Sequence, residues 1–139
     1  MEARAIPLKY VEGLGIRGRL KQAQLIKQSR EEYERTGKVY DRPKVSDAPV
    51  PRSTHAKKFE DKYGFSVSNL EQVKRTFPDT LVEKILSKGR GAYGSSGSRP
   101  NTTMEAWAKA RLASVLTGGN ALQVDKDLVG PQSMAKIRS

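Results

Sequence analysis

The chain of 139 residues has room for one modest domain with additional arms and is too short for a large multi-lobed enzyme. Hydrophobic residues make up 36% of it and charged residues 29%, with one Trp, three Phe and five Tyr, so we expect a small core whose burial is completed by a partner. Lysine and arginine outnumber aspartate and glutamate by 26 to 15, and the formal net charge of +11 favours acidic or phosphate-rich partners.

The rare residue types exclude several kinds of chemistry. The chain contains no cysteine, which removes disulfides and thiolate metal sites, and its single histidine is His55. We therefore predict no metal, no cofactor and no small-molecule substrate. No apolar run approaches the roughly 20 residues of a transmembrane helix, and no signal-peptide pattern is present, so we expect a soluble protein that is not exported.

The first 53 residues are expected to form an arm, a helix and a strap. Glycine and proline in residues 1–15 predict an extended arm. The helix is predicted from Ile16 to about Arg35, with an apolar stripe of Ile16, Leu20, Ala23, Ile26 and Tyr33. Residues 37–53 contain three prolines, which favour extended backbone and indicate either a strap that wraps a partner or a solvated linker.

The charges of this first helix are placed against its dipole. Basic side chains occupy its positive end, at Arg17, Arg19 and Lys21. Acidic side chains occupy its negative end, at Glu31, Glu32 and Glu34. The stabilising arrangement is the opposite one, so we expect a partner to hold this helix.

Short helices with clear start and stop signals are predicted next. The first runs from about His55 to Tyr63 and ends at Gly64, and the second is capped by Ser68 with Glu71. Phe77-Pro78 separates it from a third helix, which begins at Asp79 and is expected to stop at Gly89. This spacing resembles a helix-turn-helix, but we favour the packing of five apolar side chains of the two helices against one another: Leu70, Val73, Phe77, Leu81 and Ile85.

A loop, a last long helix and a tail complete the prediction. Residues 89–101 hold four glycines, three serines and a proline and predict a loop. Its first six residues spell GxGxxG, but no strand precedes them, so a nucleotide site is not expected. Thr102 with Glu105 is expected to cap the last helix, which ends at Gly118-Gly119 and packs Trp107 against Leu81 and Ile85. Residues 120–139 read as a loose basic tail with solvated aspartates at positions 125 and 127.

These elements predict a mainly α protein, with a small bundle of short helices over about residues 55–118. Its parts are an N-terminal arm, helix and Pro-rich strap at 1–53, a helical domain at 54–119 and a basic C-terminal tail at 120–139. Catalysis finds little support, because no carboxylate pair lies in an apolar setting and the serines of the loop lack a nearby base, so we do not expect an enzyme.

Five cations are the candidate binding residues, for phosphates or for an acidic partner. They are Lys84, Lys88, Arg90, Arg99 and Arg111. We also expect Arg99 to brace the glycine-rich loop through carbonyls or an acidic group, because Pro100 leaves its side chain free to fold back.

Residues from about Lys57 to Asp125 resemble an uncharacterised family of small basic proteins of large DNA viruses of algae and protists, with relatives in cyanophages. The resemblance is carried by KKFEDKYG at 57–64, the helix pair, KGRGAYGSSGSRPN at 88–101, Trp107 and ARLASVLTGG at 110–119. Two departures are Gly94, where that family usually has an aromatic residue, and the helix-pair turn, where Thr76-Phe77 replaces a Thr-Gly pair.

The resemblance implies a virus particle as the setting. Together with the strap and the small core, it predicts a structural protein of the virion, assembled inside the host cell. Such a minor capsid protein would bridge major capsid subunits and other minor capsid proteins from the inner side of the shell. The alternative is a nucleic-acid-binding protein that places its basic side chains on phosphates.

Overall fold

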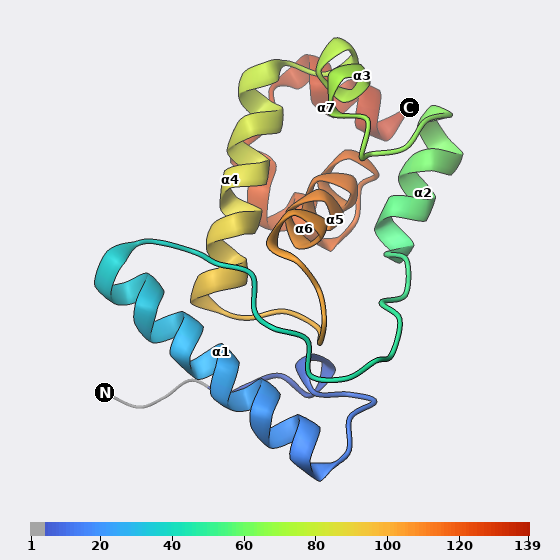
Figure 1. Ribbon diagram of the computed structural model, residues 1–139. Helices are drawn as coiled ribbons and strands as arrows, with labels where there is room; N and C mark the ends of the chain where they lie inside the picture. The colour runs from blue at the N-terminus through green and yellow to red at the C-terminus, as the bar shows by residue number, and fades with distance from the viewer. Residues whose placement is uncertain (1–4) are drawn as a thin grey trace. The chain divides into compact units, whose positions relative to one another are not determined.

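A computed structural model describes residues 5–139 of the chain, and over this range it is helical without a strand (Figure 1). The predicted fold class, a mainly α protein with a small helical bundle, is confirmed. The helices are α1 (Ile16–Thr36), α2 (Thr54–Tyr63), α3 (Leu70–Thr76), α4 (Asp79–Ser95), α5 (Met104–Leu116), α6 (Asn120–Asp125) and α7 (Pro131–Arg138), with short 3-10 turns at Leu8–Tyr10 and Lys126–Leu128.

The chain forms two compact units, and each is built from two separate stretches of sequence. Unit 1 comprises residues 1–50 and 90–107, of which the first four lie outside the described part, and unit 2 comprises residues 51–89 and 108–139. The predicted parts 1–53, 54–119 and 120–139 follow the chain in sequence. They therefore do not anticipate that residues 90–107 belong with the N-terminal stretch.

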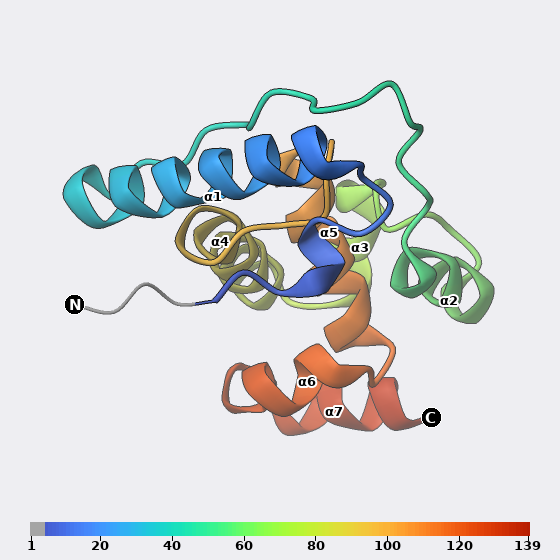
Figure 2. The ribbon, with the colours of Figure 1, turned by 90° about the horizontal axis from the view of Figure 1, so that it is seen from below.

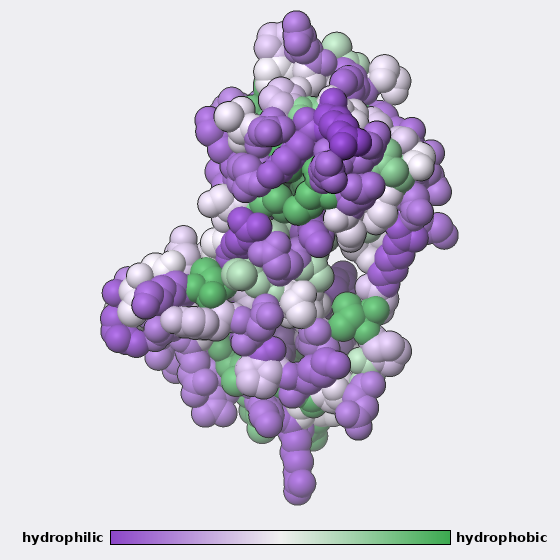
Figure 3. All heavy atoms as spheres, turned by 45° about the horizontal axis from the view of Figure 1, so that its top comes forward, coloured by the Kyte–Doolittle hydropathy of each residue, from purple (hydrophilic) through white to green (hydrophobic). Residues whose placement is uncertain are grey.

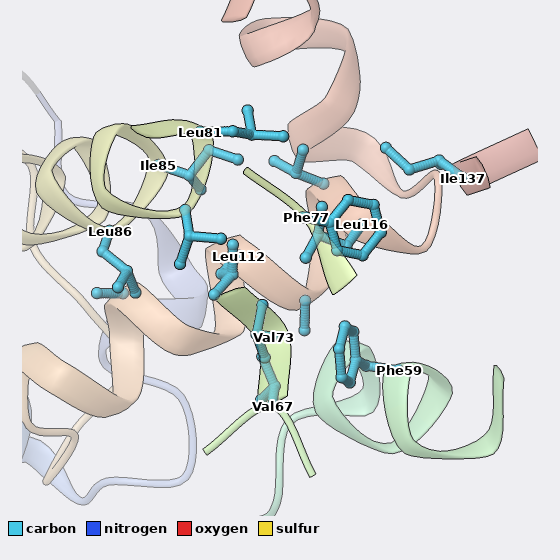
Figure 4. Packing of buried hydrophobic residues seen from close by; sticks show 14 of the residues in the cluster. Phe59, Val67, Val73, Phe77, Leu81, Ile85, Leu86, Leu112, Leu116 and Ile137 are labelled. Carbon is cyan, nitrogen blue, oxygen red and sulfur yellow. The ribbon is translucent and has the colours of Figure 1, made fainter. Parts of the chain in front are cut away.

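Unit 2 contains the apolar core (Figure 4). Phe59 of α2, Ile85 of α4 and Leu112 of α5 are completely buried in one cluster. Val73, Phe77 and Leu81 join them, as the packing interpretation of the helix pair predicts. At the edge of the cluster the Tyr63 hydroxyl donates to the Leu116 carbonyl over 2.5 Å.

The C-terminal residues of unit 2 are folded, which corrects the predicted loose tail. Figure 2 shows α6 and α7 as helices that follow α5. Leu122 and Ile137 belong to the apolar cluster and are 7% and 3% exposed. Pro131 stands at the first turn of α7, where a backbone N–H is not required, so it is compatible with this short helix.

Unit 1 is held together largely by polar groups. Its buried side chains include Gln22, Tyr93 and Ser98 beside the apolar Ile26. The Gln22 amide donates to the Ser98 carbonyl over 3.3 Å. Ile16 and Leu20 of the predicted stripe are 80% and 68% exposed, so that part of the prediction is wrong.

Helix α4 continues into the segment 89–101 that is predicted as a loop and ends at Ser95, so the loop prediction is wrong for residues 89–95. Its glycines permit close packing, which compensates for their low helix propensity. A Cβ atom on Gly89 would lie 2.7 Å from the Cα of Ala108, and one on Gly94 would lie 2.8 Å from a methyl carbon of Val39. The GxGxxG pattern therefore reflects helix packing here.

Two helix caps and one aromatic contact also differ from the prediction. Asn69 caps α3 through a bond from the Gln72 amide, and Thr103 accepts a bond from the Ala106 amide at the start of α5. Both caps lie one residue after the predicted position. Trp107 is not part of the apolar cluster of unit 2, and its ring meets the Tyr10 ring edge-on at 5.9 Å.

Candidate functional site

Three of the five candidate cations belong to unit 2, and two of these converge on one buried carboxylate. Asp125 has no exposed surface, and its oxygens accept two bonds of 2.9 Å from the Arg111 guanidinium. The Lys88 ammonium lies 3.3 Å from the same carboxylate. The third cation, Lys84, is exposed on α4, and none of the carboxylates in the described part of the chain pairs with it.

This arrangement corrects the expectation of a solvated Asp125. Burial alone would raise the pKa of Asp125, but hydrogen bonds and positive charge from Arg111 and Lys88 outweigh it, so its pKa is held below the ordinary value. The carboxylate therefore stays ionised and ties α5 and α4 to the end of α6. Arg111, a candidate for phosphates or an acidic partner, is an internal ion-pair partner in the structure.

The other two candidates belong to unit 1 and also meet carboxylates. The Arg90 guanidinium donates to both oxygens of Glu105, over 2.6 and 3.2 Å. Arg99 lies 3.7 Å from Glu12, and both side chains are more than half exposed. An exposed pair at this distance contributes little. Arg99 therefore does not brace the loop as we expected.

The bracing arginine is Arg42, which the sequence analysis did not select. Its guanidinium donates to the Tyr93 carbonyl at 2.7 Å, the Ser98 hydroxyl at 2.7 Å and the Ser29 hydroxyl at 2.9 Å. The same group stacks on the Tyr93 ring at 3.7 Å. Burial lowers the pKa of Arg42 from its ordinary value, which still leaves an arginine charged.

Arg42 precedes Pro43 as Arg99 precedes Pro100. Either arginine can fold its side chain back, because the proline that follows restricts only the backbone. What distinguishes the two arginines is burial, and burial depends on contacts with residues more than 50 positions away in the sequence.

The strap, defined as residues 37–53, is fastened to unit 1 at several points. The Asp41 carboxylate accepts a bond from the Met104 amide at 2.7 Å, and the Arg42 amide donates to the Tyr93 hydroxyl at 2.9 Å. The Asn101 side chain accepts from the Val45 amide at 2.8 Å and donates to the Ala48 carbonyl at 3.2 Å. The strap is thus held in a defined extended path, which removes the solvated-linker alternative for residues 41–48.

The single histidine lies in unit 2, near the start of α2. Burial, followed by the nearby charge of Lys58, lowers the pKa of His55, and its Nδ1 atom has no hydrogen-bond partner among the described residues. Over residues 5–139, no three His, Asp or Glu side chains lie close enough to hold a metal ion. No helix in this range is both long enough and apolar enough to cross a membrane.

The fold and these contacts define a class of protein. It is a helical protein of two compact units, in which most of the five candidate cations form ion pairs within their own unit. The chain belongs to a protein family described as a family of unknown function (DUF5824), whose model matches residues 7–129. No curated protein and no solved structure matches the chain.

Proposed function

We propose that the protein is a non-enzymatic structural protein that joins other protein subunits in a virus particle, as a minor capsid protein on the inner side of the shell. The observation that carries this proposal is the strap. Its residues 41–48 are fastened to unit 1, while residues 47–52 are exposed in an unbroken series. An extended chain that is already ordered loses little further conformational entropy when it lies across a partner.

Two further features support a structural role. Three of the five candidate cations, Lys88, Arg90 and Arg111, pair with carboxylates of their own unit and so stabilise its fold. The large net charge remains, and it suits an acidic protein surface. The virus particle as the setting, with major capsid and other minor capsid proteins as partners, rests on the sequence resemblance.

The proposal is tested on purified particles of the virus that encodes the chain. Quantitative mass spectrometry is expected to find the protein in many copies per particle, and cross-linking from Lys44 of the strap is expected to reach a capsid protein. Absence of the protein from purified particles would contradict the proposal.

A matched pair of variants tests the strap itself. Asn101 has a positive φ of 63°, so Asn101→Gly keeps the backbone conformation and removes the side chain that fastens the strap. We expect this variant to enter particles less efficiently than the wild type. The control, Asn120→Gly, changes an exposed asparagine and should enter normally. Equal incorporation of both variants would show that the fastened strap is not required.

A nucleic-acid-binding protein is the second candidate. It is favoured by the net charge of +11 and by exposed cations such as Lys84, which no carboxylate in the described range neutralises. Binding to duplex DNA would then weaken steeply with salt, with a slope of about 0.9 per phosphate contact on a double logarithmic scale. A flat salt dependence, or no binding at low salt, would count against this candidate.

A further inference from the structure

One side of the first half of α1 exposes apolar and cationic side chains together. Ile16 and Leu20 are 80% and 68% exposed, and Arg17, Lys21 and Lys27 are exposed as well. At about 100° per residue, Leu20 and Lys27 lie within about 40° of Ile16 around the helix axis, and Arg17 and Lys21 follow at about 100° and 140°, so these side chains share one side of the helix. The space-filling view shows that apolar residues reach the surface in small patches among polar ones (Figure 3).

The charges on this side are not neutralised within the described protein. No carboxylate occurs in α1 before Glu31, and none of the described carboxylates pairs with Arg17, Lys21 or Lys27. Two other cations of this helix are engaged, since Arg19 donates to the Leu14 carbonyl at 3.0 Å and Arg30 donates to the Ser96 carbonyl at 2.9 Å. The exposed side therefore keeps uncompensated positive charge next to two apolar side chains.

The combination of positive charge and exposed apolar side chains favours one chemical class of partner over others. Positive charge at the positive end of the helix dipole is unfavourable, and an anionic partner would relieve it. A phosphate backbone offers no apolar surface to Ile16 and Leu20, and a second copy of the chain brings the same net charge of +11. A polypeptide with both carboxylates and apolar side chains satisfies both requirements.

We propose that the exposed side of α1 from Ile16 to Lys27 is a docking surface for an acidic protein segment that also carries apolar side chains. The inference rests on the proposed structural function and names the class of partner that this function requires. It also gives a use to side chains that unit 1 leaves exposed.

The test measures binding of labelled peptides to the full chain by fluorescence anisotropy. One peptide contains glutamate and leucine, a second contains the same glutamates with serine in place of leucine, and a duplex DNA is the third probe. We expect the leucine peptide to bind roughly tenfold or more tightly than the serine peptide, because only the leucine peptide covers apolar surface.

Substitutions on α1 are compared with matched controls elsewhere. Arg17→Glu with Lys21→Glu, and separately Ile16→Ser with Leu20→Ser, should each weaken binding of the leucine peptide roughly tenfold. Lys57→Glu with Lys58→Glu reverses two exposed charges on α2, and Val124→Ser changes an exposed valine; both should bind as the wild type does. Thermal unfolding followed by circular dichroism shows that each variant is folded.

Several results would overturn the inference. The first two are absence of peptide binding and equal binding of the two peptides. The third is that the α2 charge reversals weaken peptide binding as much as the α1 substitutions do. The fourth is that duplex DNA binds more tightly than the peptides and that the α1 charge reversal abolishes this DNA binding. The last result would assign the surface to nucleic acid. Since the particle experiment does not use these peptides, peptide binding by a protein that is absent from particles would refute the structural function and leave the docking surface standing.

Discussion

The two units are stabilised in different ways. Unit 2 is built around one apolar cluster, in which side chains such as Phe59, Ile85 and Leu112 are completely buried. Unit 1 buries few apolar side chains and relies on directed hydrogen bonds, above all those of Arg42. Apolar burial tolerates changes of shape as long as volume is kept, whereas a hydrogen-bonded network depends on particular donors and acceptors.

The two units also differ in how many large apolar side chains they leave exposed. Of the six large apolar side chains that stay exposed among the described residues, five belong to unit 1 and one, Val124, belongs to unit 2. A unit that buries its apolar residues has few left for contacts, while unit 1 keeps such residues at its surface. Unit 2 therefore contains most of the buried apolar side chains, and unit 1 contains most of the large apolar side chains that stay exposed.

The largest expected effect is in the apolar core. Phe59→Ala removes a completely buried ring and should lower the free energy of unfolding by about 3–5 kcal/mol. Urea unfolding followed by circular dichroism measures the change. The control Val124→Ala, at a side chain that is 67% exposed, should change it by less than about 0.5 kcal/mol. Similar midpoints for the two variants would show that the cluster does not stabilise unit 2.

The next effect tests the network of unit 1. Arg42→Lys keeps a positive charge but cannot reproduce the planar set of donors to Tyr93, Ser98 and Ser29. We expect the free energy of unfolding to fall by about 1.5–3 kcal/mol. Urea unfolding followed by the fluorescence of the single tryptophan, Trp107, which belongs to unit 1, measures this change.

The matched control for that variant is Arg99→Lys. Arg99 also precedes a proline, but it is exposed and makes one long contact with Glu12, so its substitution should cost less than about 0.5 kcal/mol. A larger loss from Arg99→Lys than from Arg42→Lys would reverse the assignment of the bracing residue.

A somewhat smaller effect is expected at the ion pairs of unit 2. Asp125→Asn should lower the free energy of unfolding by about 1–3 kcal/mol at neutral pH, because Arg111 and Lys88 lose their carboxylate partner. The loss is limited because both cations keep some contact with water. Since the pKa of Asp125 is lower in the folded than in the unfolded protein, this contribution is present above the unfolded pKa and is lost as the pH falls through the folded pKa.

Thermal melts at neutral and acidic pH test this sign. The difference between wild type and Asp125→Asn should shrink on acidification. Asp127→Asn changes the exposed neighbour of the same turn and should have little effect at either pH. A difference that grows with acidity would contradict the assignment of Asp125 as the ionised partner.

The smallest expected effect concerns His55. Its pKa is lowered in the folded protein, so the unfolded chain binds the proton more readily, and stability should fall as the pH drops below the ordinary histidine pKa of about 6.5. His55→Gln should remove this slope between neutral and mildly acidic pH. Melting temperatures measured across that range give the result, and an unchanged slope would show that another group titrates there.

The parts of the fold that were predicted correctly are those set by local sequence. The first helix was expected from residue 16 to about residue 35 and runs to Thr36. Helix α2 ends at Tyr63, directly before Gly64, which adopts a positive φ of 81°. Both ends depend on neighbouring residues alone. The inward side of α1 was predicted less well, since Ile16 and Leu20 match the helical period but are exposed.

The errors arose where distant residues decide the outcome. Gly89 and Gly94 have low helix propensity and would weaken an isolated helix. In the structure Ala108 and Val39 pack so closely on them that a larger residue would not fit within α4. Asp125 looks solvated in the sequence, and its burial depends on Lys88, 37 residues earlier in the chain. The sequence shows that the candidate residues are cations, but it does not show that most of these charges pair with carboxylates of the same unit.

The way in which the two units share the chain has a consequence for synthesis on the ribosome. Unit 1 requires residues 90–107, so its N-terminal stretch cannot complete its contacts when it emerges. Residues up to 50 must wait until residue 107 has been made, which takes about 3–11 s at roughly 5–20 residues per second. During that interval α1 has neither Tyr93 nor Ser98 to pack against, and its exposed cations are available to any acidic chain nearby.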